Sequence, residues 1–176
     1  GSAEFGGGAL LDMSGQDSYY SFQQSQGFGS VMGSGLLADF GPQKDIYIAD
    51  NEHIDFPALV DKKHNTSLSQ GVAAGVRADI SDGHSMAGGI GALVDGGGDN
   101  EFTAGFFSQG TSYWYGVGIL SSGTGHDTFK AGKYALGTSA HFGVGILHDL
   151  GGNDQYTVQQ ELALGEGHDF GVGFFI

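Results

Sequence analysis

The chain has 176 residues, of which 35 are glycine and 2 are proline, and 39% are hydrophobic. Such a composition can form one hydrophobic core, and it excludes collagen, a proline-rich linker and a disordered tail. With no cysteine and a formal charge of −14, disulfides and thiolate metal sites are excluded, and nucleic acid is disfavoured as a partner.

Residues 1–5, GSAEF, are typical of an expression vector, and we expect the native domain to begin after them. A signal peptide could therefore have been removed, so its absence does not favour the cytoplasm. No run of about 18 apolar residues occurs, and no transmembrane helix is expected.

Residues 6–176 repeat one pattern, and we treat them as a single domain. Leu or Phe follows a marker glycine by two residues, Asp or Ser by four, and an aromatic residue by eleven or twelve. A glycine turn of the SQG or ALG type closes the unit. The marker lies at positions 8, 35, 91, 118, 145 and 173, with intervals of 27, 56, 27, 27 and 28 residues.

Each copy is rich in Val, Ile, Phe and Tyr between Gly, Asn, Asp and Ser, which indicates short strands and turns. We predict an all-β fold, a parallel β-solenoid with about 27 residues per coil, in which equivalent residues stack in ladders about 4.8 Å apart. The alternative is one antiparallel hairpin per copy in a β-barrel. The segment TSYWYGVGIL lacks the clean alternation of a transmembrane strand and disfavours a membrane barrel.

The long interval contains two expected loop excursions, at about 50–66 and 75–89. Histidine close to carboxylates can perform acid–base chemistry on a glycosidic bond or bind a metal. The candidate catalytic residues of the first loop are His53, Asp55, Asp61 and His64; the second loop adds Asp79, Asp82 and His84. Solvation of ordinary loop side chains is the simpler interpretation of both groups.

The glycine–aspartate turns raise a second possibility. Turns such as GTGHDTF (123–129) and LGGNDQY (150–156) supply carboxylates and carbonyls that suit Ca²⁺. The candidate metal ligands are Asp12, Asp17, Asp95, Asp99, Asp127, Asp149 and Asp154. In the alternative interpretation, glycine permits the turn and the Asp side chain closes it through backbone amides.

These turns resemble those of the RTX family of secreted bacterial proteins, whose β-roll binds Ca²⁺ between successive turns. That family repeats every nine residues, whereas this chain has one such turn per copy. Nearly the whole chain is also similar to glycine-rich bacterial surface proteins with GxGxLxDxGGxDxY repeats. This resemblance implies a β-solenoid in an extracellular or cell-envelope setting and no particular activity.

The GVGIL strand is apolar on both faces. If Leu120 and Leu147 point inward, Val117, Ile119 and Ile146 point outward, where another element covers them or they form an assembly surface. The pattern stops at Ile176 within a copy, so we expect the chain to be truncated there.

The function predicted is therefore structural or adhesive, in a calcium-stabilised segment of a secreted or surface bacterial protein. Its expected partners are a second copy, another surface protein or a glycan. The alternative is a carbohydrate-active β-helix enzyme, a lyase or hydrolase, with its site on the two loops. An ice-binding solenoid is disfavoured because no regular threonine ladder occurs.

Overall fold

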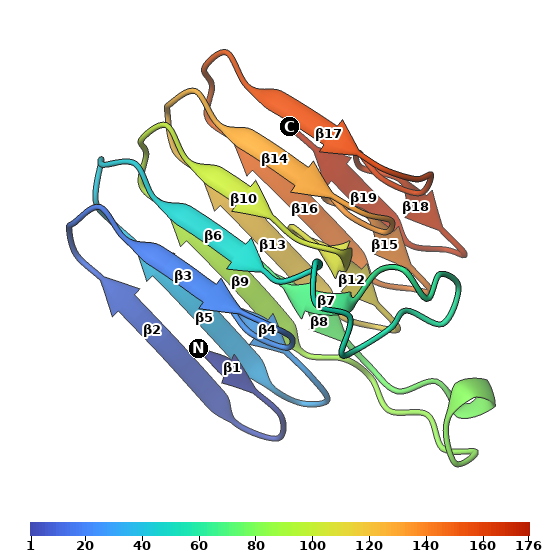
Figure 1. Ribbon diagram of the computed structural model, residues 1–176. Helices are drawn as coiled ribbons and strands as arrows, with labels where there is room; N and C mark the ends of the chain where they lie inside the picture. Colours follow the sequence, from blue (N-terminus) through green and yellow to red (C-terminus); the bar gives the residue numbers. More distant parts are fainter.

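A computed structural model describes residues 1–176 as a stack of β-coils, with the two termini at opposite ends of the stack (Figure 1). All pairs of named strands are parallel, and equivalent strands of successive coils lie side by side. The predicted parallel β-solenoid is thus confirmed, and the antiparallel hairpin alternative is wrong.

The longest strands form one side of the solenoid, in the order β19-β16-β13-β9-β5-β2. Their bounds are β2 Gly7–Asp12, β5 Ser34–Asp39, β9 Ile90–Asp95, β13 Val117–Ser122, β16 Val144–Asp149 and β19 Val172–Phe175. Leu93 pairs with Leu120 and Leu120 with Leu147, so the 27-residue period sets the register. These leucines are fully buried, while Ile119 and Ile146 point outward and are partly exposed, as alternation predicts.

The second side carries the aromatic ladder, in the order β17-β14-β10-β6-β3. Its strands are β3 Ser18–Ser21, β6 Ile46–Ala49, β10 Glu101–Thr103, β14 Thr128–Ala131 and β17 Gln155–Val158. The rings of Tyr47, Phe102 and Phe129 stack with centroids 4.7 Å apart and are fully buried. Stacking at the coil spacing explains why the aromatic residue keeps its phase in every copy.

Two-residue strands form the third side, in the order β1-β4-β8-β12-β15-β18. They are β1 Ser2–Ala3, β4 Phe28–Gly29, β8 Ala73–Ala74, β12 Ser112–Tyr113, β15 Ser139–Ala140 and β18 Gly167–His168. This side lies so close to the long strands that a Cβ on Gly118 would meet the Thr111 carbonyl oxygen at 2.0 Å. The marker glycine is therefore required by close backbone approach.

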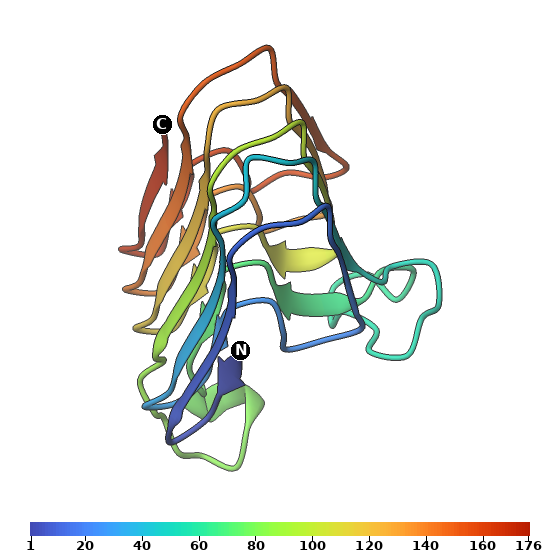
Figure 2. The same cartoon turned by 90° about the vertical axis from the view of Figure 1, so that its left-hand side faces the viewer.

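Two loops leave the stack at different corners (Figures 1 and 2). Residues 50–65 connect β6 to β7 (Thr66–Ser69), which pairs with β11 (Phe106–Ser108). Residues 75–89 connect β8 to β9 and contain the short 3-10 helix η1 (Ala78–Ile80). These loops account for the long interval between two marker glycines.

Candidate functional site

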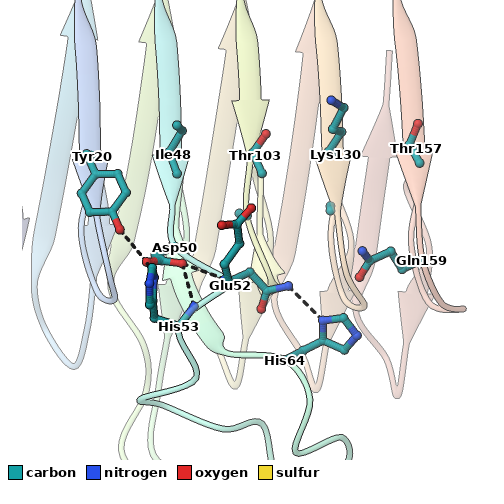
Figure 3. Close-up of a pocket in the computed structure, with 13 residues that line it drawn as sticks. Tyr20, Ile48, Asp50, Glu52, His53, His64, Thr103, Lys130, Thr157 and Gln159 are labelled. Atoms are coloured by element: carbon teal, nitrogen blue, oxygen red, sulfur yellow. Dashed lines mark hydrogen bonds and ion pairs between the residues drawn. The ribbon is translucent and has the colours of Figure 1, made fainter.

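A cleft of about 620 Å³ lies between the outer face of the aromatic sheet and the loop of residues 50–65. Its floor consists of side chains from one outward-pointing position of the repeat, which lie in a row because the strands of neighbouring coils pair in register. The floor residues are Tyr20, Ile48, Thr103, Lys130 and Thr157, which Figure 3 shows in one row across five strands. The cleft therefore runs along the solenoid axis.

The loop wall of the cleft is organised by Asn65, which is fully buried. Its Oδ1 accepts hydrogen bonds from the backbone N–H groups of Asp55 and Phe56. Its Nδ2 donates to the carbonyl oxygens of Asp50 and His53, at 2.9 and 2.8 Å. One amide side chain thus satisfies four backbone groups of the loop and fixes the shape of the wall.

Asp50 is the best-connected carboxylate in the cleft. Its Oδ2 accepts hydrogen bonds from the Tyr20 hydroxyl at 2.5 Å and from Nδ1 of His53 at 2.7 Å, and its Oδ1 accepts from the backbone N–H groups of Glu52 and His53. These donors, the Tyr20 hydroxyl foremost, hold the pKa of Asp50 well below its usual range. Asp50 is therefore an anion that orients Tyr20 and His53.

The two histidines of the wall have different surroundings. The hydrogen bond to Asp50 raises the pKa of His53, whose side chain is 75% exposed. His64 stacks on the ring of Phe106 with centroids 5.1 Å apart, and its Nδ1 lies 2.9 Å from Nδ2 of Asn51. Both imidazoles line the cleft, as Figure 3 shows.

The four candidate catalytic residues do not converge on one point. His53 and His64 line the cleft, but Asp55 and Asp61 do not. The Asp61 carboxylate accepts hydrogen bonds from Nε2 of Gln160 at 2.7 Å and from the backbone N–H of Lys63, which ties the loop to the last full coil. The carboxylates of the cleft are instead Asp50 and Glu52.

The second loop borders a separate, smaller groove of about 330 Å³. Apolar side chains dominate it, including Leu59, Val60, Ile80 and Phe107. Of the second group of candidates, Asp79 pairs with Arg77 at 2.5 Å, and His84 pairs with Asp82 at 3.1 Å. None of these three candidates lines the cleft or this groove.

Six of the seven candidate metal ligands, all but Asp99, lie in two columns along the corner between the long strands and the aromatic sheet. Two carboxylate triplets have oxygens within 4.8 Å of one another; they are Asp12, Asp17 and Asp39, and Asp127, Asp149 and Asp154. Asp39 was missed by the sequence prediction, although it occupies the same repeat position as Asp12. Asp95 lies between the two triplets, and Asp99 accepts a hydrogen bond from the backbone N–H of His126.

Several residues of the cleft were also not predicted from the sequence. The floor residues Tyr20, Thr103 and Lys130 share one outward position of the repeat, and this alignment can be read from the period. Asp50 had no such signal, because its four donors come together only when the loop folds around Asn65.

Searches against protein-family models, curated proteins and solved structures found no match to this chain. No helix in the structure has the length and apolar character needed to cross a membrane.

Proposed function

We propose that this chain is an adhesive β-solenoid segment of a secreted or surface bacterial protein, and that it binds a neutral polysaccharide in the cleft. The observation that carries the proposal is the cleft itself, an elongated groove whose floor repeats one position over five coils. The extracellular setting rests on the resemblance of the repeats.

The lining of the cleft suits a polyhydroxylated ligand. Hydroxyls of Thr103 and Thr157 and the amides of Asn51 and Gln159 offer both donors and acceptors. The Tyr20 ring is 55% exposed and held by its bond to Asp50, so it can stack on the apolar face of a sugar.

Charge favours a neutral ligand over an acidic one. The cleft pairs Asp50 with His53 and also contains Glu52 and Lys130, so its positive and negative groups nearly balance. The whole chain carries −14, which repels a polyanion approaching from solution.

Binding is better supported than turnover. Hydrolysis of a glycosidic bond needs one carboxyl group that can donate a proton beside a second carboxylate. Asp50 accepts four hydrogen bonds and its lowered pKa keeps it ionised, so Glu52 is the one carboxyl of the cleft left for that task. The predicted pair Asp55 and Asp61 lies outside the cleft.

A glycan array followed by calorimetric titration with the best neutral oligosaccharide tests this proposal. We expect Tyr20→Ala to weaken binding about five- to tenfold, since one aromatic stacking contact contributes about 1 to 1.5 kcal/mol. Tyr20→Phe keeps the ring and should retain most of the affinity. Tyr115→Ala removes another half-exposed ring, away from the cleft, and serves as the matched control.

Two results would contradict the proposal. Binding that is equally lost in the Tyr20→Ala and Tyr115→Ala variants would place the ligand elsewhere. Release of reducing ends from the oligosaccharide, abolished by Glu52→Gln, would replace adhesion by catalysis.

A further inference from the structure

Each coil places two polar side chains opposite one another at the corner after the long strand. We call them the strand-end position (Asp12, Asp39, Asp95, Ser122, Asp149) and the turn position (Asp17, Asp45, Asn100, Asp127, Asp154). The two positions are five residues apart in four coils and six apart in the second, and the turn residues stack on one another through the whole series, so the five pairs act as a natural substitution series at one corner.

In two coils a hydrogen-bond donor bridges the pair. Asn100 donates from Nδ2 to Oδ1 of Asp95 at 2.8 Å, and the Ser122 hydroxyl donates to Oδ2 of Asp127. The Oδ1 atom of each turn residue accepts a hydrogen bond from a backbone N–H of the preceding coil. Asn100 accepts from the N–H of Asp45, and Asp127 accepts from the N–H of Asn100. One atom of the turn residue therefore faces the preceding coil, and the other faces the strand-end residue.

In the first two coils both positions are carboxylates and this donor is missing. Asp45 is fully buried, and its Oδ1 accepts the backbone N–H of Asp17 at 2.6 Å. Its Oδ2 is buried without a partner, and in the repeat it corresponds to the Nδ2 of Asn100, which donates to the strand-end residue of its own coil. Oδ2 of Asp17 is likewise buried without a partner.

No cationic side chain compensates these carboxylates. The nearby Lys44 is paired with Glu101 at 2.5 Å. Asp39 is fully buried and receives neutral donors, the Tyr19 hydroxyl and the backbone N–H of Gly41. Carboxylates crowded in a buried place repel one another strongly unless a positive charge lies between them.

We propose that a Ca²⁺ ion binds between the first two coils, with Asp12, Asp17, Asp39 and Asp45 as its carboxylate ligands. The oxygens of the first three lie within 4.8 Å of one another, which is twice a Ca²⁺–oxygen distance of about 2.4 Å. An all-oxygen ligand set without histidine or cysteine selects a hard cation.

The second triplet does not carry the same proposal. None of Asp127, Asp149 and Asp154 has a buried oxygen without a partner. The proposed site takes its ligands from successive coils, and it follows from the two unsatisfied oxygens rather than from acidic residues alone.

The substitution Asp45→Asn tests the site, because the chain itself has asparagine at this position in the next coil. After treatment with EDTA, calorimetric titration with Ca²⁺ and thermal melting are compared for the wild type, Asp45→Asn and Asp55→Asn. Asp55 is an exposed loop residue whose carboxylate makes no hydrogen bond, so it is the matched control.

We expect Ca²⁺ to raise the thermal unfolding midpoint of the wild type and of Asp55→Asn. The Asp45→Asn protein should melt above the wild type in EDTA, because its new amide can donate to Asp39. It should also bind one Ca²⁺ ion fewer. If this variant fails to fold, Tb³⁺ emission sensitised by Tyr19 and Tyr47 in the wild type, and displaced by Ca²⁺, gives an independent readout.

An equal number of bound ions in the wild type and Asp45→Asn would overturn the proposal. A thermal midpoint of the wild type that changes with neither Ca²⁺ nor EDTA would also overturn it. The absence of a Tb³⁺ emission that Ca²⁺ can displace would overturn it as well. One further result would also overturn it. If the thermal midpoint of the wild type rises on acidification and Asp45→Asn removes this dependence on pH, a proton shared by Asp39 and Asp45 bridges the pair in place of Ca²⁺.

Discussion

At the scale of single residues, burial decides how the corner carboxylates ionise. Asp95 and Asp127 are almost completely buried, and burial raises the pKa of each to about 6, although each accepts hydrogen bonds. In the unfolded chain an aspartate has a pKa of about 3.9. The folded state therefore holds these protons more tightly than the unfolded state.

This difference predicts that stability falls as pH rises. The contribution is fully present below about pH 4 and is lost as pH rises through about 6. We expect thermal midpoints in EDTA to decrease over this range. Asp127→Asn should remove about 3 kcal/mol of the pH dependence, because an amide does not ionise and each pKa unit between the two states corresponds to about 1.4 kcal/mol. If the thermal midpoints of the wild type and Asp127→Asn depend on pH in the same way, Asp127 is not a source of this pH dependence.

At the scale of elements, the third side of the solenoid depends on close backbone contact. Gly35, Gly91, Gly118 and Gly145 all face this side, and a Cβ on any of them would lie within about 2 Å of a carbonyl oxygen. Glycine is also needed at the turns that close each coil, for example Gly110 with φ of +77°. The repeated glycine is thus a packing requirement and not a ligand-binding signature.

Gly118→Ala should accordingly destabilise the fold by about 3 kcal/mol or more, because neither backbone can move without shifting its coil. Gly7→Ala is the control, since Gly7 lies in the same sheet and a Cβ there meets nothing within 4 Å. Denaturant unfolding monitored by tyrosine fluorescence measures both. A similar loss in the two variants would show that the cost does not come from the contact with the Thr111 carbonyl oxygen.

Much of this element-level organisation could be predicted from the sequence, and the reason is periodicity. A ladder of Leu93, Leu120 and Leu147 is visible as a 27-residue repeat because each coil must present the same side chain to its neighbour. The cleft wall could not be predicted in the same way. It depends on contacts such as Asn65 to Asp50, which occur once and follow no period.

At the scale of the whole molecule, the solenoid presents surfaces of different character. The cleft face is polar and runs along the axis, whereas the outer face of the long strands is apolar, with Val172 and Phe174 exposed near the C-terminal end. The polar groove along one side fits the proposed attachment to a long, repetitive ligand. The apolar side is available for packing against further protein.

Amide shifts in a ¹⁵N-labelled sample titrated with the neutral oligosaccharide selected by the array test the adhesive role most directly. We expect the shifts to concentrate in the loop of residues 50–65 and on one outward row of the aromatic sheet, at Tyr20, Thr103, Lys130 and Thr157. Shifts centred instead on the apolar groove beside Ile80 and Phe107, or on the outer face of the long strands, would contradict it.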